Sequence, residues 1–150
     1  MCASPLSLKS RALRLLSGRE HSRSELERKL QRFEEEPGSL ARVLDELQSK
    51  DFINEQRVVD SVIYRRSTKL GSVRIQHELQ NKGLDPDTVR SAVTALHSTE
   101  FERAREVWRK KFPQAPQDNA ERARQVRFLA ARGFSGDVVY RVVGRDPATE

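Results

Sequence analysis

The sequence has very little of what catalytic and metal-binding sites are usually made from. It contains one cysteine, Cys2, and three histidines that lie far apart, at His21, His77 and His97. A single cysteine cannot form an intramolecular disulfide or a cysteine metal cluster, and no HxxxH or HExxH pair is present to bind a metal ion. A glycine-rich loop of the kind that holds a phosphate group is also absent. We therefore predict that the protein is not an enzyme and uses no cofactor or metal.

Long apolar segments are missing as well. The sequence has no run of about 20 apolar residues that could cross a bilayer, and its N-terminus lacks the pattern of a secretory signal. We therefore expect a cytoplasmic protein without membrane contact. Hydrophobic residues make up 36% of the chain and charged residues 33%. This composition provides little material for one thick core and favours a row of small helical units.

Glycine and proline are sparse, and apolar residues recur at helical spacing along almost the whole chain. Ser22 with Glu25 forms a capping-box pattern at the start of one predicted helix, and Asp118 with Glu121 forms a similar pattern at another. Ser39 is predicted to cap a third helix. The predicted helices cover residues 8–18, 22–36, 39–47, 55–69, 72–82, 85–96, 101–112, 118–132 and 135–144.

Short signals mark helix ends in the middle of the chain. Asp85 before Pro86 is a typical helix start, because proline lacks an amide that the first turn would leave unpaired. Gly83 is predicted to end the preceding helix in the left-handed conformation, and Gly133 ends a later one. Only the valine-rich segment 135–144 fits a strand almost as well as a helix.

An internal repeat resolves that ambiguity in favour of a helix. A short acidic insertion near residues 34–36 brings three successive segments into register. Leucines and valines then recur at equivalent positions, namely Leu30, Leu79 and Leu129, followed by Val43, Val89 and Val139. We predict an all-α fold of three tandem three-helix repeats, residues 1–54, 55–99 and 100–150, that forms an elongated, curved helical array.

The charge of the chain is positive, with a formal net charge of +6. A basic protein is suited to a polyanionic partner such as DNA, or to an acidic protein groove. Between residues 65 and 82 five cations face one acid, Glu78, and a second basic region spans residues 103–132. Cations in such a strip can displace the counterions condensed on DNA. The alternative interpretation is that they form ordinary solvated helix faces.

Several segments resemble the RecX family of regulatory proteins. Residues 19–26 (REHSRSEL) are similar to the signature of its first repeat. Residues 71–79 (GSVRIQHEL), closed by Lys82 and Gly83, are similar to the signature of its second. Residues 44–47 and 52–57 resemble the family's turn into the fourth helix. The resemblance extends from about residue 8 to residue 143.

The sequence departs from the family pattern at two places. Ser72 stands where the family usually has proline, and the first repeat has Arg32 and Phe33 with the acidic insertion instead of a lysine-glycine stop. The resemblance implies a cytoplasmic monomer of three three-helix repeats that binds filaments of the RecA recombinase on single-stranded DNA. It further implies a negative regulator of recombination and repair that inhibits strand exchange, ATP hydrolysis and co-protease activity. The DNA would be contacted directly or through the filament.

An extended array of this kind could span neighbouring protomers of a filament, so that many weak contacts add. The candidate contact residues are the basic side chains of the first two repeats: Arg65, Arg66, Lys69, Arg74 and Lys82, with Arg19, Arg23 and Lys29. Two alternatives stay open at this point. One is a helix-turn-helix protein that reads duplex DNA, although the predicted third helix around residues 88–96 is poor in base-reading side chains. The other is a helical scaffold for a different acidic partner.

Overall fold

The structure, a computed structural model, describes residues 6–144 and is helical throughout that range, with no strand. The predicted all-α fold is therefore confirmed, and the valine-rich C-terminal segment is a helix. In chain order the elements are α1 Leu8–Gly18, α2 Arg23–Leu30, the 3-10 turn η1 Gln31–Phe33, α3 Ser39–Ser49, α4 Glu55–Arg66, α5 Ser72–Asn81, α6 Pro86–Lys111, α7 Asn119–Ala131 and α8 Gly136–Val143.

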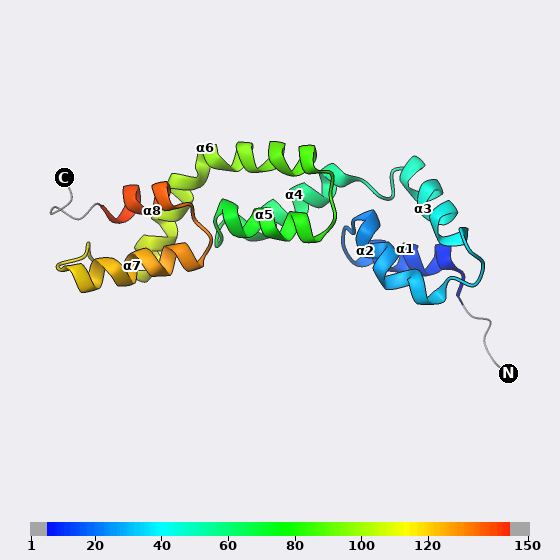
Figure 1. Cartoon of the computed structure of the whole chain (residues 1–150), viewed down its shortest axis with the longest axis horizontal. Coiled ribbons are helices and arrows are strands. Elements are labelled where there is room, and N and C mark those ends of the chain that lie inside the picture. The colour runs from blue at the N-terminus through cyan, green and yellow to red at the C-terminus, as the bar shows by residue number, and fades with distance from the viewer. Residues whose placement is uncertain (1–5, 145–150) are drawn as a thin grey trace.

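The helices form an elongated, arched row of three bodies (Figure 1). Each body has its own cluster of buried apolar side chains. We call them unit 1 (α1, α2 and α3), unit 2 (α4, α5 and the first half of α6) and unit 3 (the second half of α6, α7 and α8). The three cores centre on Leu26 and Leu44, on Val62 and Leu79, and on Leu129. A helical repeat array is thus the correct architecture, whereas the boundaries at 54/55 and 99/100 stay predictions.

Units 2 and 3 share one long helix. The sequence predicted two helices over residues 85–96 and 101–112, but α6 runs without a break from Pro86 to Lys111. Neither glycine nor proline follows Pro86 within this segment, so the backbone has no reason to stop. Val89 and Leu96 are buried in unit 2, and Ala104 is buried in unit 3. The separation into two helices was therefore wrong.

The helix ends follow local side-chain chemistry, with three corrections, the first of which is that the helix predicted to reach residue 36 ends at Leu30 and is followed by η1. The box at Ser22 is confirmed, since its hydroxyl accepts from the Glu25 amide at 3.1 Å and the Glu25 carboxylate accepts from the Ser22 amide at 3.2 Å. Ser39, in contrast, is the first residue of α3 and not its cap; the Leu40 amide donates to the Glu34 carboxylate at 2.8 Å instead. Helix α4 ends at Arg66 and not at residue 69.

The middle helices of the three units lie end to end along one edge of the row, in the order α7, α5, α2 (Figure 1). The C-terminal turn of each meets the N-terminus of the next, so the helix dipoles align head to tail. Gly83 and Gly133, which follow α5 and α7, have φ of +69° and +88°. This confirms the predicted left-handed stop at Gly83 and gives both meeting points the same backbone form. We call them joint 1 (α2 on α5) and joint 2 (α5 on α7).

Backbone contacts dominate joint 2. The Gly71 amide donates to the Arg132 carbonyl at 2.9 Å, and the Val73 amide donates to the Gly133 carbonyl at 2.9 Å. A Cβ atom on Gly71 would lie 2.4 Å from the Gly133 backbone. Only glycine allows the two chain segments to approach this closely.

Candidate recognition surface

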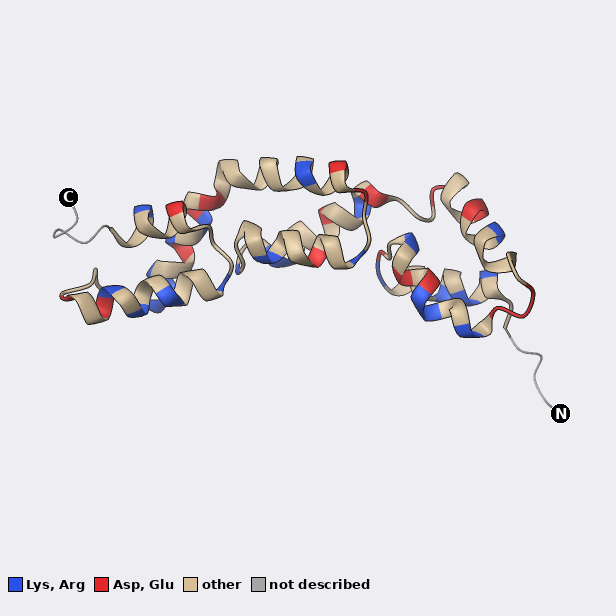
Figure 2. Cartoon of the chain, in the orientation of Figure 1, with Lys and Arg blue, Asp and Glu red and all other residues tan. Residues whose placement is uncertain are grey.

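Lysine and arginine are unevenly distributed over the row (Figure 2). They gather on α1, α2, the α4 and α5 side of unit 2, and α7. The first half of α6 is nearly free of them, since residues 86–98 contain one cation, Arg90, which pairs with Asp87 at 2.6 Å. The basic surface is therefore concentrated on the side away from that part of α6.

The structure separates the five cations predicted in the second repeat. Arg65, Arg66 and Lys69 are exposed near the end of α4. Arg66 forms an ion pair with Glu78 at 3.3 Å. Arg74 and Lys82 lie at opposite ends of α5, in different joints. These five residues therefore do not form one patch.

Arg74 and Lys82 make contacts that hold units together. The Arg74 guanidinium donates to the Ala131 carbonyl at 3.0 Å across joint 2. The Lys82 ammonium lies 3.1 Å from the Glu25 carboxylate across joint 1, and its side chain is only 13% exposed. These interactions give both residues a role in the fold, whatever else they bind.

The three predicted residues of the first repeat are also engaged. Arg19 pairs with Glu25 at 2.7 Å, and Arg23 pairs with Asp45 at 2.6 Å. Lys29 is exposed and has no acidic partner within the described residues. Much of the positive charge counted in the sequence is therefore neutralised locally.

Joint 1 is built around the buried carboxylate of Glu25. Besides its ion pairs with Arg19 and Lys82, it accepts from the Ser22 amide. Burial alone would raise the pKa of Glu25, but these three partners outweigh it and hold the pKa at about 2. The Ser22 hydroxyl completes the joint by donating to the Lys82 carbonyl at 2.6 Å.

A second buried carboxylate, Glu100 of α6, lies at joint 2. One of its oxygens accepts from the Ser72 hydroxyl at 2.9 Å and from the Ser72 and Ser135 amides at 3.3 and 3.0 Å. Its other oxygen has no hydrogen-bond partner among residues 6–144. Glu100 thus binds the N-terminal amides of α5 and α8, where a negative charge also interacts favourably with the helix dipoles.

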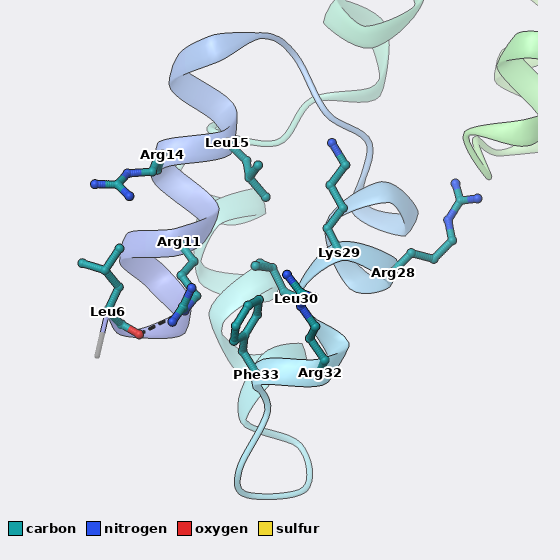
Figure 3. Close-up of a pocket in the computed structure, with 9 residues that line it drawn as sticks. All are labelled: Leu6, Arg11, Arg14, Leu15, Arg28, Lys29, Leu30, Arg32 and Phe33. Atoms are coloured by element: carbon teal, nitrogen blue, oxygen red, sulfur yellow. Dashed lines mark hydrogen bonds between the residues drawn. The ribbon is translucent and has the colours of Figure 1, made fainter. Parts of the chain in front are cut away.

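Two basic hollows on the surface contain most of the cations that are not engaged in this way. The first, the α1–α2 hollow, has a volume of about 480 Å³ (Figure 3). It is lined by Leu6, Arg11, Arg14, Leu15, Arg28, Lys29, Leu30, Arg32 and Phe33. Its five cations and the absence of any acid among its lining residues make it strongly positive.

The second, the α6–α7 hollow, lies where units 2 and 3 meet and has a volume of about 410 Å³. Its Phe128 ring lies 5.0 Å from the Arg132 guanidinium carbon and 5.7 Å from the Lys111 ammonium. It also has no acid, and it is lined by Thr68, Lys69, Val107, Lys110, Lys111, Phe128 and Arg132.

Of the eight residues predicted from sequence, only Lys29 and Lys69 line these hollows. Lys110, Lys111 and Arg132 of the second hollow lie in the basic region predicted over residues 103–132. Four cations of the first hollow were missed because it joins α1 and α2, which are separate in the sequence: Arg11, Arg14, Arg28 and Arg32. The signal that could have identified the first one is the i, i+3 pair Arg11 and Arg14, which places two cations on one face of α1.

In the part of the chain that the structure describes, no three histidine, cysteine, aspartate or glutamate side chains are grouped to hold a metal ion. Among those same residues, no helix combines the length and apolar character that a membrane span needs. Cys2 lies outside the described residues.

Comparison with known proteins assigns the family. Residues 9–47 match a model described as the first three-helix domain of RecX, and residues 98–143 match the third. The regulatory protein RecX of Leptothrix cholodnii is 51% identical over 92% of this chain and 88% of its own length. The RecX of Herminiimonas arsenicoxydans is 47% identical, with 87% and 86% covered.

Solved structures agree on the fold. The crystal structure of RecX from Lactobacillus salivarius superposes with a TM-score of 0.78 at 20% identity and covers 91% of this chain and 92% of that one. Another structure, of a regulatory protein RecX, gives a TM-score of 0.75 and covers 91% of this chain and 70% of its own. With identities of up to 51% across most of the chain, the protein belongs to the RecX family of regulatory proteins.

Proposed function

We propose that the protein is a negative regulator of RecA. It binds the filament that RecA forms on single-stranded DNA, and it inhibits strand exchange, ATP hydrolysis and co-protease activity. The observation that carries this proposal is membership of the RecX family, at up to 51% identity over most of the chain. In this proposal it acts in the cytoplasm as a monomer, and regulates recombination and DNA repair.

The shape of the molecule supports a filament as the partner. Three small units in an arched row offer a long contact surface (Figure 1). Contacts from successive units are intramolecular once the first has formed, so their affinities combine through effective concentration. A row of this form can contact more than one protomer of a filament, and the basic hollows are suited to acidic protein surfaces or to DNA.

The test is inhibition of the RecA ATPase on single-stranded DNA by the full chain. We expect inhibition by the wild type, and weaker inhibition by a variant in which Arg65, Arg66 and Lys69 are all changed to glutamate. The control reverses two charges elsewhere, with Arg42 and Arg90 changed to glutamate, because both are exposed and lie outside the hollows and joints. The control should inhibit as the wild type does.

Two results would contradict the proposal. If the wild type does not change the ATPase rate or the appearance of filaments in electron micrographs, RecA is not its partner. If it instead prefers one duplex sequence over others, the helix-turn-helix alternative is the better one. The contact residues are a separate question: equal inhibition by a folded triple variant would remove Arg65, Arg66 and Lys69 from the interface and leave the partner unchanged.

A further inference from the structure

We propose that the α1–α2 hollow binds single-stranded nucleic acid directly, with its cations on the phosphodiester groups. This goes beyond the proposed function, because it gives the isolated protein a nucleic-acid site that needs no recombinase. None of the cations in this hollow forms an ion pair within residues 6–144. They are Arg11, Arg14, Arg28, Lys29 and Arg32. Their charge is available to an outside anion, unlike that of Arg19, Arg23 and Lys82.

The guanidinium groups at the floor of the hollow are held in place before any ligand arrives. The guanidinium carbon of Arg11 lies 3.8 Å from the centre of the Phe33 ring, and that of Arg32 lies 4.7 Å from it. Arg11 also donates to the Leu6 carbonyl at 3.3 Å (Figure 3). Fixing these side chains lowers the entropy lost on binding. Their planar groups match phosphate oxygens, and their faces can stack with bases.

The opposite wall of the hollow is fixed by the fold. Lys29 donates to Nε2 of the buried His21 at 3.1 Å. Burial, together with the charges of Arg19 and Lys29, lowers the pKa of His21, so the ring stays neutral and accepts this bond. Arg28 donates to the Asn81 carbonyl at 2.9 Å, which connects the hollow to joint 1.

An acidic loop limits the site on one side. A neighbouring hollow shares Arg11, Arg32 and Phe33 but is also lined by Glu35 and Glu36. The phosphodiester backbone of a nucleic acid is repelled by these two carboxylates and attracted toward Arg14 and Arg28. The positive region therefore has an acidic border. This border favours one defined path for the nucleic-acid backbone over unspecific attraction to the whole surface.

The chemistry of the hollow favours nucleic acid over an acidic peptide. Four of its five cations are arginines, whose fork-shaped guanidinium groups suit phosphate, and two of these groups lie against the Phe33 ring. The α6–α7 hollow does not support the same inference. Three of its four cations are lysines, which lack the fork-shaped guanidinium group.

The experiment measures binding of a fluorescein-labelled oligothymidylate to the full chain by anisotropy, at several salt concentrations and without RecA. The test variant combines Arg14→Ala with Arg32→Ala. Losing two phosphate contacts should weaken binding roughly tenfold at low salt and reduce the slope of log affinity against log salt by about 1.4. The control combines Arg42→Ala with Arg90→Ala, which removes the same charge outside the hollow and should leave affinity and slope near the wild-type values.

The inference is overturned if the wild type does not bind the oligonucleotide, or if test and control variants weaken it equally. It is also overturned if polyglutamate displaces the oligonucleotide more effectively than unlabelled oligothymidylate, because the hollow would then suit an acidic protein segment. Circular dichroism checks the fold, and Lys29→Ala with Arg14→Ala replaces the test variant if loss of Arg32 unfolds unit 1. Inhibition of RecA by a wild type that binds no oligonucleotide would refute this site and leave the proposed function standing.

Discussion

The two joints repeat one design with different chemistry. In both, the N-terminus of a middle helix meets a left-handed glycine stop, and a buried carboxylate lies beside the contact. Joint 2 is fastened by backbone hydrogen bonds, by α6 running through both units, and by Glu100. Joint 1 is fastened by side chains, with Glu25 held between Arg19 and Lys82. Units 2 and 3 therefore form one stiff body, whereas unit 1 is attached through charged contacts.

The largest effect expected from this comparison is that of Gly71→Ala. The new methyl group would overlap the Gly133 backbone, so joint 2 must open, and we expect a loss of about 3 kcal/mol in the free energy of unfolding. Urea unfolding followed by circular dichroism measures it. The control is Gly18→Ala, where nothing lies within 4 Å and a gain of about 0.5 kcal/mol is expected. Equal stability of the two variants would mean that joint 2 is not closely packed.

A smaller loss is expected for Glu100→Ala. Removing the carboxylate leaves the Ser72 and Ser135 amides and the Ser72 hydroxyl without a partner, which should cost about 2 kcal/mol. The control is Glu102→Ala, an exposed residue of the same helix, which should change stability by less than about 0.5 kcal/mol. If the unfolding midpoints of the two variants coincide, Glu100 does not hold the joint.

The smallest effect expected is a dependence of joint 1 on pH. The pKa of Glu25 is lowered from its ordinary value of 4.5 to about 2 in the folded protein. A lowered carboxyl pKa gives stability that is present above pH 4.5 and is lost as the pH falls toward 2. Because Arg19 is 40% exposed, solvent screening reduces the effect to about 1 kcal/mol.

The measurement for Glu25 is the difference between wild type and Glu25→Gln. Urea unfolding between pH 6 and pH 2.5 should show the wild type losing its advantage over the variant as the carboxylate takes up a proton. Taking the difference removes the contribution of Glu46, whose pKa is also about 2. A constant difference across this range would show that joint 1 does not depend on the charge of Glu25.

Features that depend on neighbouring residues could be predicted from the sequence. The capping box of α2 could be predicted from the spacing of Ser22 and Glu25 alone. The end of α5 could be predicted from Gly83, because glycine readily adopts the left-handed backbone conformation found there. Helix α8 was predicted correctly only because the repeat outweighed the strand preference of its valines. The break in α6 was predicted wrongly, since the repeat pattern suggested a boundary that the backbone does not need.

Features that depend on distant residues could not be predicted. Nothing near Gly71 in the sequence indicates that Gly133 lies against it, and nothing near Glu100 indicates Ser135. The segments that carry the family resemblance, residues 19–26 and 71–79, contain the contacts of both joints. The same limit applies to the hollows, because Arg14 and Arg32 line one hollow only after α1 has packed against α2 and η1.

The head-to-tail order of the middle helices has a consequence for how long such a molecule can be. Helix α2 is followed by the 3-10 turn Gln31–Phe33, without the left-handed glycine that would receive a preceding helix. At the far end, the Glu121 amide of α7 donates to the cap residue Asp118, and the Glu121 carboxylate accepts from the Gln117 amide just before the helix. The tip at α2 therefore lacks the left-handed glycine that receives the next helix at joints 1 and 2, so a further helix could not dock there in the same way.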